Sequence, residues 1–241
     1  MAITLVQSAA ITNNTVSTLA FGSNNTAGNL LIAVGRLVNT GSSTTISDSA
    51  GNSNWALLQS FLNLGAADQN LCFWYAPNCK GSANTVQFPT GYAFYEGIIA
   101  EYSGVAISSP TDQQNSNSTT SSVATLQPGS ITPSQNGELI VTWSANNNAN
   151  STTQTINSGF SLVSTNSFGN VYFAHILGGT TSPINPTWDC TSQNLTDWGV
   201  GIVSFFAAGS GGQGNSPIGN VIIDLDSDGF PILEVQTGTN A

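Results

Sequence analysis

The feature that most constrains the fold is a set of short, β-branched and aromatic segments that occurs twice in the same order. TVSTLAF from Thr15 is echoed by SVATLQP from Ser122, and GNLLIAV from Gly28 is echoed by GELIVTW from Gly137. Four further pairs follow in unbroken order: NWALLQS with GFSLVST, QNLCFWYA with GNVYFAHI, NTVQF with NPTWD, and EGIIAEYSG with WGVGIVSFF. Because the members of each pair stand about one hundred residues apart, the order predicts an internal duplication of a six-strand unit.

These segments are five to nine residues long and are separated by clusters of Asn, Gly, Ser and Asp, and none carries a helical period. The pattern predicts an all-β fold, a jelly-roll-like or Ig-like β-sandwich. Two arrangements fit. Two tandem Ig-like domains would meet in the polar stretch 108–121, whereas interleaved copies would form one sandwich over residues 1–208, with halves of about 1–107 and 108–208. Segments that are apolar on both faces, such as LLIAV and GVGIVSFF, favour the single sandwich.

Charge is scarce in this chain, and that excludes several classes of partner. Only 6% of the 241 residues are charged, two of them are basic, and the net charge is −10. Binding to nucleic acid needs several Lys or Arg contacts, so we expect no nucleic-acid partner. Membrane insertion is not expected either, because no apolar run approaches the length of a membrane-spanning helix. A composition rich in Asn, Ser, Thr and Gly is typical of virion shells, fibres and adhesins, which predicts a virion or extracellular location.

The residues available for catalysis are few. The only histidine, His175, lies in the strand-like segment NVYFAHIL, and no GxSxG motif accompanies it. Three scattered cysteines, Cys72, Cys79 and Cys190, do not have the spacing of a zinc site, and we expect them to be buried and unpaired rather than to form one disulfide. We therefore predict a protein that is not an enzyme.

A carbohydrate site has the best candidates where a carboxylate stands beside an aromatic ring. Trp188 precedes Asp189, and Asp197 precedes Trp198; Trp55 is a third aromatic candidate. Such pairs are typical of sugar-binding surfaces, and packing of the tryptophans in a core is the alternative.

The C-terminal segment differs from the rest. Residues 209–218 form a Gly-rich linker, and residues 219–241 carry Asp224, Asp226 and Asp228 followed by Gly229, the beginning of a calcium loop. Glu234 stands at position eleven instead of twelve, and no helices flank the loop. A compatible interpretation is a β-hairpin, NVIIDLD and FPILEVQ, with a turn at SDG. Its apolar stripe would serve as an assembly surface on the same chain or on a neighbour, and consists of Val221, Ile223, Phe230 and Ile232.

The succession AGNLLIAVGR, ISDSAGNSNW, FWYAPN, ANTVQF, IIAEYSGV and GVGIVSFFAA resembles a β-sandwich module of bacterial exported and phage-associated proteins, whose functions are largely undetermined. The resemblance covers about residues 2–208. It implies a sandwich with an extracellular binding or structural role, and it carries over no catalytic residues.

Together these features predict a non-enzymatic structural or adhesive surface protein. Because the N-terminus lacks the basic and apolar regions of a secretory signal, a phage virion component is favoured: a head decoration, tail or fibre protein. Its expected partners are other copies of itself, other virion or surface proteins and a cell-surface glycan, with calcium as the candidate cofactor. The alternatives are a secreted carbohydrate-binding or adhesion module and, third, a calcium-dependent glycoside-active enzyme.

Overall fold

The computed structural model describes residues 2–39, 41–66, 68–147, 153–190 and 193–209, together with the backbone of 222–225 and 231–234. The chain divides into two compact units, residues 1–210 and 211–241. The described residues are all-β, as the sequence predicts. Since they contain no helix, they contain none that is long and apolar enough to span a membrane.

The first eight strands form two antiparallel sheets. A five-stranded sheet has the order β1-β8-β3-β6-β5, and a three-stranded sheet has the order β2-β7-β4. The strands are β1 (Thr4–Ala10), β2 (Thr18–Ala20), β3 (Leu30–Val38), β4 (Ser47–Asp48), β5 (Ala56–Leu64), β6 (Gln69–Ala76), β7 (Thr85–Gln87) and β8 (Phe94–Ser103). Except for β5 and β6, which are neighbours in the large sheet, successive strands alternate between the two sheets, as is typical of a jelly roll.

The next eight strands repeat the arrangement. Their sheets have the orders β13-β14-β11-β16-β9 and β10-β15-β12, so that adding eight to each strand number of the first set reproduces the second. The strands are β9 (Thr111–Thr119), β10 (Thr125–Leu126), β11 (Glu138–Ala145), β12 (Thr155–Ile156), β13 (Ser161–Thr165), β14 (Val171–Gly179), β15 (Trp188–Asp189) and β16 (Trp198–Phe205). We call β1–β8 the first jelly roll and β9–β16 the second; the duplication is visible in the topology, with eight strands per copy where the sequence showed six.

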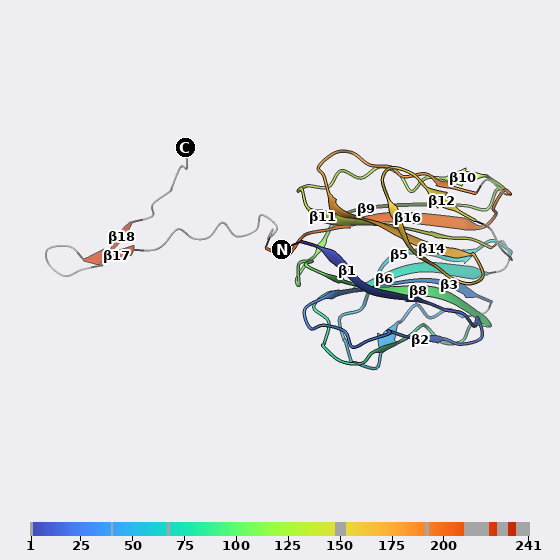
Figure 1. The fold of residues 1–241 in the computed structure, drawn as a ribbon, viewed down its shortest axis with the longest axis horizontal. Coiled ribbons are helices and arrows are strands. Elements are labelled where there is room, and N and C mark those ends of the chain that lie inside the picture. The colour runs from blue at the N-terminus through green and yellow to red at the C-terminus, as the bar shows by residue number, and fades with distance from the viewer. Residues whose placement is uncertain are drawn as a thin grey trace. The chain divides into compact units, whose positions relative to one another are not determined.

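The two copies are not interleaved, which corrects the favoured sequence interpretation. Each sheet contains strands of one copy only. The two large sheets lie face to face between the two small ones, so the first unit has four layers (Figure 1). Strands such as β3 and β16 are buried along their whole length, because one face of each meets the small sheet of its own copy and the other face meets the large sheet of the other copy. The doubly apolar strands thus do lie in the centre of a thick core, but that core is built from two complete jelly rolls.

Three apolar clusters fill the gaps between the layers. The central cluster joins the two large sheets and contains Phe73, Tyr102, Trp143 and Phe205. Each outer cluster fills one jelly roll, around Trp74 and Phe88 in the first copy and around Trp188 in the second. Side chains that alternate along one strand therefore serve two different cores.

The two jelly rolls are related by an approximate two-fold axis. The edge strand β1 contacts β13, and β8 and β3 contact β14 across the centre. Tyr102 on β8 packs against His175 on β14 with ring centroids 5.7 Å apart. Phe205 on β16 packs against Tyr75 on β6 at the same separation of 5.7 Å. Because β16 and β14 are the second-copy counterparts of β8 and β6, the same contact is made twice, as in an isologous dimer.

In the second unit, β17 (Ile222–Leu225) pairs with β18 (Pro231–Glu234) as an antiparallel hairpin, as the sequence predicts. Ile223 pairs with Leu233 and Asp224 pairs with Ile232, so Ile223 and Ile232, two residues of the expected stripe, are not cross-strand partners. The expected turn and much of the apolar stripe lie outside the described residues, namely Val221, Asp226, Asp228 and Phe230. The calcium site at Asp224, Asp226 and Asp228 therefore stays a prediction.

Candidate functional site

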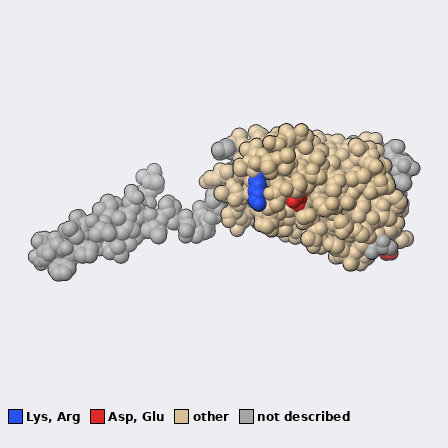
Figure 2. Space-filling model, turned by 90° about the horizontal axis from the view of Figure 1, so that it is seen from below, with Lys and Arg blue, Asp and Glu red and all other residues tan. Residues whose placement is uncertain are grey.

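Most ionisable groups of the described chain have roles inside the fold. Arg36 forms an ion pair with Glu96, Nη1 to Oε2 2.9 Å, and both side chains are buried. Glu101 is fully buried and accepts four hydrogen bonds from neutral donors; these come from Gln7 Nε2, Asn25 Nδ2, Thr26 N and Asn29 Nδ2. Figure 2 shows a face of the molecule on which almost all atoms belong to uncharged residues. That face is therefore nearly free of charge.

His175 has a structural position. Its Nδ1 lies 2.9 Å from the Tyr102 hydroxyl across the central cluster, and burial lowers the pKa of the imidazole. Within the described chain the three cysteines are buried and form no disulfide, as expected. Burial raises the pKa of the Cys72 thiol to about 12, which leaves it protonated at neutral pH.

The predicted carbohydrate residues are not brought together at the surface. Trp188 and Trp198 are fully buried in the outer cluster of the second jelly roll, where their Nε1 atoms donate to Thr142 Oγ1 and Ser144 Oγ. Their ring faces are closed to a ligand, so core packing, the alternative interpretation, describes them. Indole rings have a large apolar area, and each N–H here finds a buried hydroxyl as its partner.

The remaining three predicted residues have local roles. Asp197 is buried, has φ 47°, and accepts from Asn147 Nδ2 at 3.2 Å, while half-buried Asp189 pairs with both Thr125 and Thr155 in the small sheet. Trp55 belongs to a turn in the first jelly roll, where its Nε1 donates to Asp48 Oδ2 at 2.8 Å. The sequence pattern SDSAGNSNW is thus a turn organised around one carboxylate.

Asp48 shows how such turns are stabilised. Burial by itself would raise the pKa of this carboxyl, but hydrogen bonds from Asn52, Trp55 and Asn84 outweigh that effect. The pKa of Asp48 is therefore lower than usual, and the carboxylate stays ionised as a hub for the turn.

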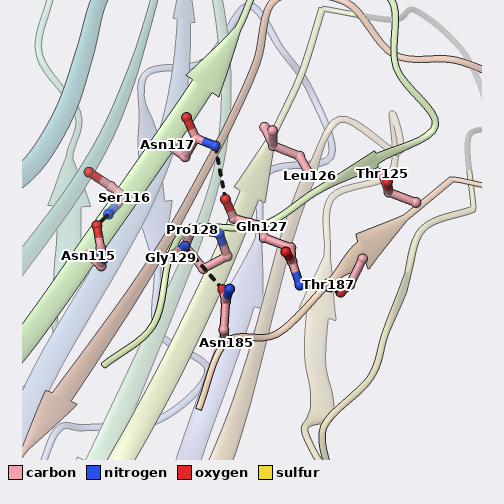
Figure 3. A pocket seen from close by; sticks show the side chains of 10 residues that line it. All are labelled: Asn115, Ser116, Asn117, Thr125, Leu126, Gln127, Pro128, Gly129, Asn185 and Thr187. Atoms are coloured by element: carbon pink, nitrogen blue, oxygen red, sulfur yellow. Dashed lines mark hydrogen bonds between the residues drawn. The ribbon is translucent and has the colours of Figure 1, made fainter. Parts of the chain in front are cut away.

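The candidate functional site is a groove on the second jelly roll, between strand β9 and the edge of the small sheet at β10. It has a volume of about 730 Å³. The lining, shown in Figure 3, consists of Asn115, Ser116, Asn117, Thr125, Leu126, Gln127, Pro128, Gly129, Asn185 and Thr187. Amide and hydroxyl groups dominate this list, and none of the described lining residues is ionisable.

Local hydrogen bonds hold several amides of the groove in place. Asn117 Nδ2 donates to the Gln127 carbonyl at 3.1 Å, and Asn115 Nδ2 donates to the Ser130 carbonyl at 3.2 Å. Gly129 N donates to Asn185 Oδ1 at 3.1 Å (Figure 3). These bonds tie the segment after β10 to β9 on one side and to Asn185 on the other. The groove walls are thus fixed by contacts within the second jelly roll.

The equivalent place in the first jelly roll is different. Between β1 and β2 lies a smaller hollow of about 210 Å³, lined by Ala10, Ile11, Thr12, Asn13, Val16, Thr18 and Leu19. The β2 residues Thr18 and Leu19 correspond to Thr125 and Leu126 of β10 in the duplicated order. One copy therefore has a small, partly apolar hollow where the other has a wide polar groove.

Sequence reasoning missed the groove because its residues carry no catalytic or apolar signal. The composition of TDQQNSNST indicates part of a polar boundary between domains, but the stretch forms the nine-residue edge strand β9. Its side chains are largely exposed on both faces, so the apolar alternation that identifies a strand is missing. The signal that could have identified β9 is the duplication, because β1 occupies the corresponding place in the first copy.

No protein-family model matches this chain, and no curated protein or solved structure is detectably similar to it. The resemblance to exported and phage-associated sandwich modules therefore stays a prediction.

Proposed function

We propose that this protein is a non-enzymatic structural or adhesive component of an outer surface. The observation that carries the proposal is the distribution of polar groups. Ionisable side chains such as Arg36, Glu96 and Glu101 are used inside the fold, while the large groove on the second jelly roll has an uncharged amide and hydroxyl lining. Such a molecule is suited to passive contacts through shape and hydrogen bonds.

A phage virion component, such as a head decoration, tail or fibre protein, is the favoured form of this function. Jelly rolls are a common architecture of capsid and lectin domains. The four-layer body has an apolar cluster in each of its three gaps between layers, which suits a rigid structural component. The separate hairpin, β17 with β18, offers a short two-stranded element of the kind that gains stability when it docks on another sheet.

The groove supports a second candidate function, a secreted carbohydrate-binding or adhesion module. The second copy has a wide polar groove where the first has only a small hollow. Such a difference is expected if one of the two duplicated units has become specialised for binding a ligand. This candidate shares the adhesive activity but needs no assembly.

The two candidates are separated by the mass of the protein in solution. For a virion component we expect the full chain to form an oligomer in light scattering, and a chain ending at Gly209 to be a monomer with an unchanged melting temperature. The melting temperature should not change because residues 1–210 form a compact unit with their own core.

The matched variant is Ile223→Asp in the full chain, which places a charge on the predicted assembly stripe and should also give a monomer. Repeating the measurement with calcium and with a chelator tests the predicted metal. A full-length protein that is monomeric in every condition would contradict the assembly role and favour the binding module.

A further inference from the structure

We infer that the groove between β9 and β10 binds an uncharged glycan chain. This inference rests on the adhesive function proposed above and assigns it a site and a class of ligand.

The hydrogen-bonding groups of the groove match those of a polyol. A sugar hydroxyl is both a donor and an acceptor, so a surface that recognises it needs both kinds of group close together. The walls combine the amides of Asn117, Gln127 and Asn185 with the hydroxyls of Ser116 and Thr187. Asn117 uses its NH₂ group on the Gln127 carbonyl, and Asn185 uses its oxygen on Gly129 N. The carbonyl oxygen of Asn117 and the NH₂ group of Asn185 can therefore bind a ligand.

The local bonds also reduce the cost of binding. A side chain that is already held by the fold loses little rotamer freedom when a ligand arrives. Gln127 is held in this way as well, because its Nε2 donates to Thr187 Oγ1 at 2.9 Å across the groove. The site is therefore built before the ligand binds.

The lining includes an apolar element as well. Half-buried Leu126 and the buried ring of Pro128 lie among the polar groups of the same wall (Figure 3). Pyranose rings present C–H groups beside their hydroxyls, so a sugar can contact both kinds of surface at once. The groove has a volume of about 730 Å³, which lies within the usual range of sites that hold drug-sized ligands. A site of this size suits an oligosaccharide.

The charge distribution of the protein disfavours binding of acidic glycans and phosphate-bearing ligands in the groove. Of the two basic residues, Arg36 is buried in its ion pair with Glu96, and Lys80 lies in the first jelly roll beside Gly51. An anionic ligand in the groove would meet no opposite charge on a lining residue and would approach a protein of net charge −10. A neutral ligand avoids this repulsion.

The test uses the full chain on an array of immobilised glycans, with neutral hexose and N-acetylhexosamine oligosaccharides beside sialylated and sulfated ones. We expect binding to a neutral oligosaccharide and none to the acidic set. The strongest neutral binder is then titrated calorimetrically against the double variant Ser116→Ala with Gln127→Leu, which should bind at least tenfold more weakly. Both side chains are exposed, so the melting temperature should hold.

The matched control is Gln114→Leu, an exposed residue of β9 that does not line the groove, and its affinity should equal that of the unmodified protein. A second readout needs no variant: side-chain amide NMR signals of the unmodified protein should shift on titration only for groove residues. The inference is overturned if no neutral oligosaccharide binds, if acidic ones bind as well, or if both variants behave alike. An oligomer in light scattering without glycan binding would overturn this inference alone and leave the structural role standing.

Discussion

The duplication allows two buried carboxyl sites to be compared at the level of single residues. In the first jelly roll Glu101 on β8 is surrounded by donors, with hydrogen bonds of 2.6–2.8 Å. At the corresponding place in the second, Ser204 replaces the β8 carboxylate, and the carboxyl groups belong to Glu138 and Asp112. Glu138 is fully buried; Gln135 N donates to its Oε1 at 3.0 Å, whereas its Oε2 has no partner in the described chain.

Burial raises the pKa of Glu138 and the negative charge of Asp112 adds to the rise, while the hydrogen bond from Gln135 N offsets only part of it. A carboxyl with a raised pKa binds its proton more tightly in the folded state than in the unfolded chain. Its contribution to stability is complete at pH below the ordinary value of 4.5 and is lost as pH rises through the raised pKa.

The variant Glu138→Gln should therefore be more stable than the unmodified protein at pH 8, by about 1 kcal/mol, because its amide is neutral and can donate to Asp112. At pH 4 the two should melt together. Melting temperature measured from pH 4 to pH 9 checks this. Glu101→Gln is the control with the opposite expected sign. It places an NH₂ group among hydrogen-bond donors and should lower the free energy of unfolding by about 3 kcal/mol at pH 7. Equal pH dependence for Glu138→Gln and the unmodified protein would contradict the assignment.

At the scale of elements, strand β16 can lie close to β5 only because two of its residues have no side chain. A Cβ on Gly199 would come within 2.7 Å of Leu71 and Phe61. A Cβ on Gly201 would come within 2.1 Å of Gln59 Oε1 and 2.2 Å of Trp143 Nε1, the two atoms of a 2.7 Å hydrogen bond. The alternation WGVG thus makes space for Gln59, which crosses from the first jelly roll and also donates to the Asn115 and Ile202 carbonyls.

We expect Gly201→Ala to lower the free energy of unfolding by about 1–3 kcal/mol, because the added methyl group must displace the buried Gln59–Trp143 pair. Chemical denaturation followed by tryptophan fluorescence measures the loss. Gly22→Ala is the matched control: Gly22 is exposed, and the nearest atom to its Cβ, Gln7 Oε1, is 4.0 Å away. If both substitutions have the same small effect, β16 is not packed as closely as described.

At the scale of the whole molecule, a buried polar network joins the two jelly rolls at one end of the central cluster. Arg36 donates from Nε to Gln69 Oε1 at 2.6 Å and from Nη2 to Asn147 Oδ1 at 2.5 Å, in addition to its ion pair with Glu96. Asn170 of the second jelly roll donates to Glu96 Oε1 at 3.1 Å. Each partner of the ion pair therefore has a contact in the other copy.

Removing one charge should be much worse than removing both. Arg36→Met leaves Glu96 buried without its counter-charge and should cost about 3–5 kcal/mol. The double variant Arg36→Met with Glu96→Leu should cost clearly less than the two single variants added together, since no unpaired charge remains. A double-mutant cycle by chemical denaturation measures this coupling. Additive effects would show that the two charges do not stabilise each other.

The sequence by itself determined the all-β class, the duplication and the C-terminal hairpin, because strand periodicity, repeated order and the Asp-Gly turn are local signals. The doubly apolar strands β3 and β16 also predicted a thick core correctly. Only the tertiary structure decided that the copies form separate jelly rolls joined by their large sheets, since an apolar face does not specify which other face will cover it.

The candidate site was decided by tertiary structure too. Asn117, Gln127 and Asn185 are ordinary exposed polar residues in the sequence, and they become a groove only when β9, β10 and the segment before β15 meet. Trp188 and Trp198 carried the stronger local signal, but burial at 0% exposure removed them from any surface. Burial depends on the sum of distant contacts, which no short pattern records.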